Sequence, residues 1–505
     1  MPSLAGRMMK GSAWITGARA AINAIGFIST IVLARLLVPA DFGLVALGTT
    51  ILAIITAVTD MSLSQALVQH RAPSDDHFHT AWTLNAIRGL LLAGIMCLAG
   101  RPLALLYGEP RLEMLIYALA FSVLISGFSN PRTVILSKQL IFWQDFLLSV
   151  SERLVSVVVA ISIALYFRTY WALVAGAVAG QAAMLILSYL ILPFRPRVVF
   201  RHARELWSFS IWLTLGQAMN TINWRFDQLL IGQFLGRTTL GYYAVGDNLA
   251  QMPTREAITP LTHTLFPALS RIADEPHRLR AGYQRAQSIV TAVALPVGVG
   301  FALLAHPLVL AAMGAKWLPA VPIIQALSAV FALQTLGSLV QPLGMAKGET
   351  KLLFRRDLQM FLIRLPTIIS AMMLWGLPGL IYARVFTGLF AAFVNMGVVR
   401  RLTGLAVRTQ LKANWRSLSS VGAMVAGVML IQRWFVSDRT DLPFLLMELA
   451  IIAISGAVIY IGCSTLLWIA ARRPPGPETE VAQILARLLN RLSKSPAAHD
   501  RDQTR

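Results

Sequence analysis

The sequence is short of charged side chains, and this shortage sets its class. Only 13% of its 505 residues are Asp, Glu, Lys or Arg, about half of the ~25% found in soluble domains. So few charges cannot cover a globular surface, so the apolar excess must face lipid. The apolar residues fall in blocks of about 20–25, long enough for a helix to cross the hydrocarbon core. Because lipid leaves no backbone group unpaired and no short alternating segments occur, the sequence predicts an all-α polytopic membrane protein.

Residues for disulfide, metal or enzyme chemistry are also scarce. The two cysteines, Cys97 and Cys463, lie in separate apolar runs, which suits neither a disulfide framework nor a metal site. The eight histidines have no ligand spacing, and HExxH, GxSxG and the phosphate-binding GxxxxGKS/T loop are all missing. No polar block is large enough for a nucleotide-binding or glycosyltransferase domain. We therefore predict no cofactor, no metal and no enzyme activity.

Negative charge is also scarce, and the net charge is +21. The basic residues are scattered between apolar spans rather than gathered in one domain, so nucleic acid is not an expected partner. Instead, every second loop is rich in Lys and Arg, as at 195–204, 271–285, 347–356 and 400–412. Cytoplasmic loops collect positive charge. The alternation therefore predicts an even number of spans and both termini in the cytoplasm.

We predict about fourteen transmembrane helices from the apolar runs. They are expected at 12–37, 42–68, 80–100, 112–136, 146–167, 170–193, 206–235, 239–265, 286–306, 319–343, 356–375, 378–400, 417–436 and 444–470. The first, second, seventh and eighth spans are more polar than helices that face lipid, so they are expected to face protein or water. Gly176 and Gly180, and Gly232 and Gly236, fall in GxxxG spacing, which predicts close helix approach.

An internal repeat relates two of the turns. Leu33–Gly43 (LARLLVPADFG) aligns without gaps to Ile231–Gly241 (IGQFLGRTTLG), and the same offset places Trp14 on Trp212. Each copy covers a helix end, a short turn and the start of the next helix. The copies lie six spans apart, an even number, which predicts two parallel six-helix lobes around a central cavity. Chance similarity between two apolar hairpins is the alternative.

Four regions follow from this reading. They are an N-terminal six-helix lobe at 1–200, a C-terminal six-helix lobe at 201–405, an extra helix pair at 406–471 and a cytoplasmic tail at 472–505. Within the tail, apolar residues recur at helical spacing from Val481 to Leu492. This pattern fits an amphipathic helix on the inner leaflet or a plain solvated tail.

Ionisable side chains inside the spans are the candidate functional residues, because a charge in hydrocarbon is costly. The side chains expected to line the cavity and bind substrate are Arg19, Asn23, Arg88, Arg225, Arg364 and Arg384. The carboxylates expected to couple or gate transport are Asp60, Asp227, Asp247 and Glu256.

Some of these charges have local explanations. Asp60 ends the second span, where capping or pairing accounts for it. Glu152 and Arg153 lie near the predicted start of the fifth span, where snorkelling or local pairing accounts for them. Arg225 and Asp227 stand two residues apart on different helix faces, so each is expected to have a partner elsewhere.

The spans hold more arginine than carboxylate, which suits an anionic substrate. Guanidinium groups stay charged and bind phosphate through paired hydrogen bonds. A pyrophosphate head that bears sugars would fit such a cavity, with its lipid tail left in the bilayer.

Several of these stretches resemble a known family. Leu33–Gly43 and Thr59–Gln69 (TDMSLSQALVQ) resemble the opening of the polysaccharide transporter family, which contains the Wzx-type O-antigen and exopolysaccharide flippases. Asp227–Gly236 (DQLLIGQFLG), followed by LGYYAV, resembles the seventh and eighth helices of that family.

The resemblance implies membership of the multidrug/oligosaccharidyl-lipid/polysaccharide exporter superfamily, whose members have two six-helix lobes. These flippases move undecaprenyl-pyrophosphate-linked oligosaccharides across the bacterial inner membrane for exopolysaccharide, capsule or lipopolysaccharide synthesis. The implied partners are that lipid-linked oligosaccharide, the bilayer, and the polysaccharide polymerase and chain-length machinery. Cationic cavity residues are frequent in the family, but no short motif transfers a binding site onto particular residues here. In related lipid II flippases an extra helix pair forms a lipid-tail groove, a role open to 406–471.

Two other functions compete with this one. A drug/cation antiporter of the same superfamily would favour a cavity dominated by carboxylates. A membrane-bound glycan polymerase or ligase would need a large outer loop with catalytic residues. The outer loop at 101–112 is among the longest and is too short for such a site.

Overall fold

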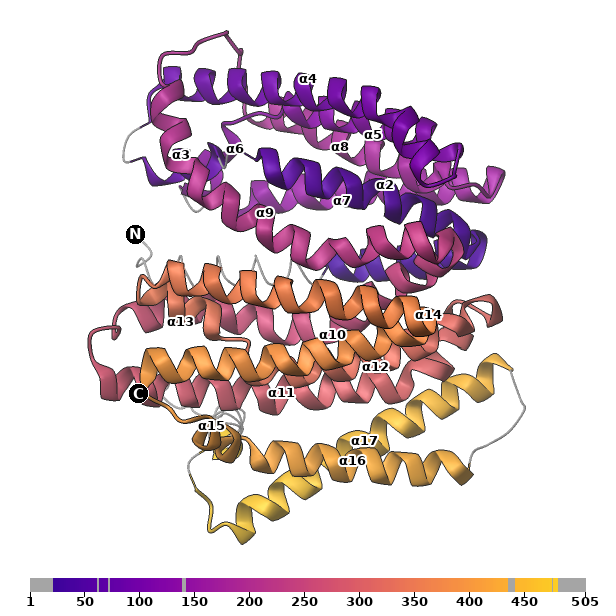
Figure 1. Cartoon of the computed structure of the whole chain (residues 1–505), viewed down its shortest axis with the longest axis vertical. Coiled ribbons are helices and arrows are strands. Elements are labelled where there is room, and N and C mark those ends of the chain that lie inside the picture. The colour runs from indigo at the N-terminus through magenta and orange to yellow at the C-terminus, as the bar shows by residue number, and fades with distance from the viewer. Residues whose placement is uncertain are drawn as a thin grey trace, which may run out of the picture. The chain divides into compact units, whose positions relative to one another are not determined.

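In a computed structural model of the chain, all described elements are helical (Figure 1). The structure describes residues 21–60, 63–70, 73–138, 142–434, 441–474 and 476–479. A first helix covers Ala21–Leu36. It is followed by α2 (Pro39–Thr59), α3 (Leu63–Gln69), α4 (Asp75–Leu106), α5 (Arg111–Gly127), α6 (Thr133–Lys138), α7 (Phe142–Phe167), α8 (Trp171–Ile191), α9 (Ala203–Phe234), α10 (Gly236–Ser270), α11 (Pro276–Ala312), η1 (Ala315–Ala320), α12 (Val321–Gln334), η2 (Thr335–Gly337), α13 (Val340–Ala346), α14 (Thr350–Thr403), α15 (Val407–Ala413), α16 (Trp415–Trp434) and α17 (Leu442–Ala470).

Helices occupy most of the described part of every predicted span, but the spans at 42–68, 112–136 and 319–343 are each made of more than one helix. Eight of the described helical segments are long and apolar enough to cross a membrane on their own. α14 accounts for two predicted spans, because its 54 residues run through a break at Gly376 with φ 61° and ψ −135°. A positive φ of this kind favours glycine. The prediction of an all-helical, multi-pass membrane protein is confirmed, and the count of fourteen spans stays a prediction.

The chain packs as two compact units. The first comprises the described residues up to Gly246 together with 312–320 and 357–380. The second comprises 247–311, 321–356 and the described residues from Ile381 onward. Both α10 and α14 therefore contribute to both units. The lobes predicted at 1–200 and 201–405 were drawn from the sequence repeat, and they stay a prediction.

Within the first unit, glycines bring helix pairs close together. A Cβ on Gly176 of α8 would stand 2.6 Å from the backbone oxygen of Ser156 on α7, and one on Gly180 would stand 2.9 Å from that of Glu152. The GxxxG spacing of this pair therefore marks a tight helix contact. Gly236 behaves differently, because it has φ 79° and no atom within 4 Å of its virtual Cβ. It serves the turn between α9 and α10 rather than close packing.

Within the second unit, the last helix pair joins the core of the preceding helices. Leu295 of α11, Ala332 of α12, Val421 and Met424 of α16, and Ile452 of α17 form one buried cluster. α16 and α17 also pack along each other (Figure 1). The extra pair is thus held to this unit by van der Waals packing of apolar side chains.

Candidate functional site

The structure joins the predicted cations and carboxylates into pairs. Arg364 contacts Asp227, Arg384 contacts Asp247 and Arg88 contacts Asp60. The sequence analysis gave these residues two separate roles, with the cations binding substrate and the carboxylates coupling or gating transport. In the structure, each of these three arginines has one of those acids as its partner.

The Asp227–Arg364 pair is deeply buried. The Arg364 Nη2 lies 2.5 Å from the Asp227 Oδ2, and the Asp227 side chain is 1% exposed. The Tyr243 hydroxyl donates a second hydrogen bond to the same oxygen, at 3.0 Å. The Arg364 guanidinium also lies 5.7 Å and 5.3 Å from the ring centroids of Trp224 and Phe226, within the range of cation–π attraction. α9, α10 and α14 thus meet at one charged group in the first unit.

The Asp247–Arg384 pair has the same construction in the second unit. The Arg384 Nη2 donates to the Asp247 Oδ1 at 3.1 Å, and the Gln251 amide donates to the other oxygen at 2.7 Å. The Arg384 guanidinium lies 5.8 Å from the Phe331 ring. Removing one partner of such a pair leaves an uncompensated buried charge, which costs about 3–5 kcal/mol.

The third pair is looser. The Arg88 Nη1 lies 3.5 Å from the Asp60 Oδ1, while its Nη2 donates to the Thr56 carbonyl at 2.9 Å. Asp60 follows the last residue of α2, with its side chain 45% exposed. Arg88 therefore contacts both a carboxylate and a carbonyl at the C-terminal end of α2. A cation is favourable there because the C-terminal end of a helix carries partial negative charge.

The remaining candidates are dispersed. Asn23 is half-buried on the Ala21–Leu36 helix, and Arg225 is exposed on α9 with no ion pair to any residue of the described ranges. Glu256 lies 3.5 Å from Arg255, its chain neighbour; Arg255 is exposed and Glu256 is half-buried. Arg19 lies outside the described residues. The cavity-lining role of these side chains stays a prediction.

The two repeated turns pack against each other in the first unit. A Cβ on Gly43 would overlap the carbonyl of Arg237, and a Cβ on Gly241 would overlap the carbonyl of Pro39. Pro39 and Arg237 are themselves equivalent positions of the repeat. The contact is thus self-complementary, like the interface of a two-fold symmetric dimer.

A third segment holds this contact together. The Lys316 ammonium donates to the carbonyls of Arg35 and Leu37 at 2.8 and 2.7 Å. The indole of Trp317, which is 0% exposed, donates to the Ala34 carbonyl at 2.9 Å. These carbonyls end the first helix and lack helical partners, so a cation and a donor stabilise them. The Trp317 ring also meets Phe42 edge-on, with 5.2 Å between centroids.

Sequence reasoning missed several of these residues. Tyr243 and Gln251 support the buried carboxylates, and Thr50 of α2 donates to the Gln228 side chain on α9 at 2.5 Å. The available signal was the run of polar residues in the seventh and eighth spans. That run shows that the helices face protein, but it does not show which partners they meet.

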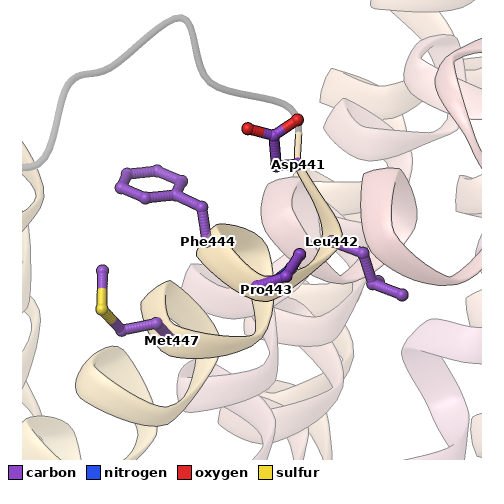
Figure 2. A pocket seen from close by; sticks show the side chains of 5 residues that line it. All are labelled: Asp441, Leu442, Pro443, Phe444 and Met447. Atoms are coloured by element: carbon purple, nitrogen blue, oxygen red, sulfur yellow. The ribbon is translucent and has the colours of Figure 1, made fainter.

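A separate pocket of about 600 Å³ opens at the start of α17 (Figure 2). Its lining consists of Asp441, Leu442, Pro443, Phe444 and Met447. Apart from Asp441 the lining is apolar. None of the predicted site residues in the described ranges lines it, so this pocket is distinct from the ion-pair sites.

The long apolar helices define the class of the chain, a multi-pass membrane protein. The model of a family described as "Polysaccharide biosynthesis protein" matches residues 32–322, more than half of the chain, and the chain belongs to this family. The resemblance to the polysaccharide transporter family is therefore confirmed. This family consists of transporters and not of enzymes, as the sequence predicted.

Curated relatives cover most of the chain at low identity. The lipopolysaccharide biosynthesis protein WzxC of Escherichia coli (strain K12) is 22% identical, over 82% of this chain and 85% of that protein. The teichuronic acid biosynthesis protein TuaB of Bacillus subtilis (strain 168) is 25% identical, over 91% and 96%. The succinoglycan biosynthesis transport protein ExoT of Rhizobium meliloti (strain 1021) is 23% identical, over 62% and 63%.

Solved structures show the same fold. The lipid II flippase MurJ, in an inward closed conformation, is similar with a TM-score of 0.73 at 14% identity, over 90% of this chain and 99% of that one. An inward-facing multidrug resistance transporter of the MATE family and MOP superfamily is similar with a TM-score of 0.54 at 16% identity, over 79% and 94%. At such identities the likeness concerns the fold alone.

Proposed function

We propose that the chain is a flippase that carries an undecaprenyl-pyrophosphate-linked oligosaccharide across the bacterial inner membrane by alternating access. The product would serve exopolysaccharide, capsule or lipopolysaccharide synthesis. Relatives named for lipopolysaccharide, teichuronic acid and succinoglycan biosynthesis support this class of substrate. The fold shared with a lipid II flippase supports the movement of a lipid-linked head group.

The buried Asp227–Arg364 pair carries the proposal. The Arg364 guanidinium is held by a carboxylate, whose oxygens accept as phosphate oxygens do. A pyrophosphate head group offers more negative charge than the carboxylate and takes its place on Arg364. Binding then separates Asp227 from its partner and disturbs the contact among α9, α10 and α14. When the head group leaves, the pair re-forms.

In this proposal the two repeated turns open and close the outer side of the transporter. The positive-inside charge pattern predicts that the turns at Gly43 and Gly241 face outward. Their self-complementary contact, held by Lys316, is then the outer closure of the transporter. The two turns separate to release the head group outside and close again for the next cycle.

The remaining assignments belong to the same proposal. Lobes at 1–200 and 201–405 enclose the cavity, the helix pair at 406–471 accommodates the lipid tail, and both termini face the cytoplasm. The released oligosaccharide passes to the polysaccharide polymerase and chain-length machinery.

The test is transport in cells whose own copy of the gene has been deleted. Arg88→Ala and Arg225→Ala, at normal membrane abundance, are expected to cause lipid-linked glycan to accumulate on the inner leaflet. Arg195→Ala is a matched control, because Arg195 is exposed on the segment between α8 and α9. Wild-type polymer output from both cavity variants would contradict the proposal.

A drug/cation antiporter is the second candidate, favoured by the buried carboxylates Asp227 and Asp247 and by the fold shared with a MATE transporter. Asp227→Asn and Asp247→Asn discriminate between the two. For an antiporter they abolish drug efflux and leave polymer output intact. For a flippase they reduce polymer output, and no drug phenotype exists to lose.

A further inference from the structure

Arg153 on α7 differs from the three paired arginines because no carboxylate of the described residues forms an ion pair with it. Its guanidinium makes no hydrogen bond or ion pair with any residue in the described ranges, and its Nε is buried. The neighbouring Glu152 packs elsewhere, with its Cγ 3.6 Å from the virtual Cβ of Gly180 on α8. The charge of Glu152 acts on Arg153 through space, but no carboxylate of the described residues is within ion-pair distance of the Arg153 guanidinium.

Arg153 also lies about three turns inside its helix. The sequence placed it near the start of a span, but α7 begins at Phe142. At 1.5 Å per residue, Arg153 stands about 16 Å from the start of this 26-residue helix. An arginine at that depth cannot reach the surface as easily as one in the first turn of the helix. Snorkelling is therefore a poor account of its position.

The direction of the side chain argues against lipid as its environment. Leu147, Leu154, Val158 and Leu165 form an exposed apolar stripe along α7, with 42–60% of each side chain accessible. This stripe is the face that suits lipid. At about 100° per residue, Arg153 projects roughly 120° away from its centre. Its guanidinium points inward, to the Ala21–Leu36 helix.

On that helix the guanidinium fits a notch at Gly26. A Cβ on Gly26 would overlap the Arg153 Nη2 and would stand 3.2 Å from Cζ. Asn23 lies one turn earlier on the same face, and the Thr30 hydroxyl one turn later donates to the Gly26 carbonyl at 2.9 Å. The face of this helix that contacts Arg153 therefore consists of Asn23, Gly26 and Thr30, whereas the exposed stripe of α7 is apolar.

We infer that Arg153, with Asn23 and the Gly26 notch, forms a binding site for the phosphate groups of the lipid-linked substrate. The inference rests on the proposed function and adds to it a residue that was not among the cavity candidates. An unpaired guanidinium binds phosphate through parallel hydrogen bonds. Unlike Arg364 or Arg384, Arg153 does so without first breaking a buried ion pair, so it is the first cation that the head group engages.

The test is ligand binding by the purified full chain in lipid nanodiscs. The probes are undecaprenyl pyrophosphate and, separately, phosphatidylglycerol, because both present phosphate on a lipid. We expect Arg153→Gln to weaken binding of undecaprenyl pyrophosphate about tenfold or more, the effect of one lost charge-assisted contact. Arg153→Lys keeps the charge but not the paired geometry, so it is expected to lie between Arg153→Gln and the wild type.

Gly26→Ala tests the notch without removing charge. The atom it meets is the end of a flexible side chain, so the fold is expected to survive while the guanidinium is displaced. Binding should weaken in this variant too. Arg168→Gln is the matched control, because it removes the same charge from an exposed residue just beyond α7, and it should bind like the wild type. Thermal melting checks that all variants are folded.

Each remaining outcome is decisive. If Arg153→Gln binds undecaprenyl pyrophosphate as the wild type does, the assignment of Arg153 is wrong while the proposed function stands. If it loses phosphatidylglycerol binding to the same extent, the site serves bulk lipid and the assignment is again wrong. If the wild type itself does not bind undecaprenyl pyrophosphate, both the proposed function and this inference fall.

Discussion

Gly43 and Gly241 occupy the same position in two copies of one turn, and each leaves room for the backbone of the other copy. The carbonyl that would be struck by a side chain belongs to Arg237 in one case and to Pro39 in the other. These two residues are also equivalent in the repeat. The glycines therefore act as a matched set, because a side chain on either one separates the same pair of turns.

The first prediction concerns this contact. Gly241→Ala is expected to lower stability by about 1–3 kcal/mol, since the added methyl group meets backbone that cannot rotate away. Thermal melting of the purified protein, followed by tryptophan fluorescence, measures the effect. Gly94→Ala is the control, because nothing lies within 4 Å of that position on α4. Equal melting temperatures for the two variants would contradict the close approach of the turns.

The second prediction concerns the buried pair on α9 and α14. Asp227→Asn and Arg364→Gln are each expected to cost about 3–5 kcal/mol, because each leaves one buried charge without its partner. The double variant should cost less than the sum, as groups in direct contact do not add. Denaturant unfolding of the four proteins gives the coupling energy. Simple additivity would mean that the two side chains do not interact.

The third prediction concerns the cap on the first helix. Lys316→Met removes the ammonium that donates to the Arg35 and Leu37 carbonyls. We expect a loss of about 1–2 kcal/mol, the contribution of a cation that closes a helix end. Lys351→Met, at an exposed position in α14, should change stability by less than about 0.5 kcal/mol. The comparison fails if both variants melt alike.

The fourth prediction separates function from stability. Arg225 is exposed and has no ion pair among the described residues, so Arg225→Ala should leave the melting temperature close to that of the wild type. It should nevertheless reduce polymer output at equal membrane abundance. Arg364→Ala should reduce both. If Arg225→Ala had normal output, its proposed contact with the substrate would be excluded.

The helices were predictable because lipid imposes a simple rule on sequence. Apolar runs long enough to cross the bilayer mark helices, and helices fill most of every predicted span in the described residues, although the spans at 42–68, 112–136 and 319–343 are interrupted. The expectation that the polar seventh and eighth spans face protein or water stays a prediction, although Asp227 of α9 is 1% exposed. The start of α7 was placed too late, because Phe142 and Trp143 precede the polar residues Gln144 and Asp145.

The partners of the charged residues were less accessible to sequence reasoning. Spacing along a helix shows that Arg225 and Asp227 lie on different faces. It does not show that Arg364 of α14 is the partner of Asp227. That pairing depends on tertiary contacts between residues far apart in the chain. The repeat aligned Gly43 with Gly241 but gave no sign that the two glycines touch. Intramembrane charge therefore identified candidates, and geometry sorted them into paired and unpaired ones.

The break at Gly376 connects the two long helical halves of α14 without a loop between them. Arg364 precedes the break and Arg384 follows it, so α14 carries one arginine of each of the two buried ion pairs. An insertion of a few residues at Gly376 would replace this short connection by a flexible linker and would leave the residues of both ion pairs unchanged.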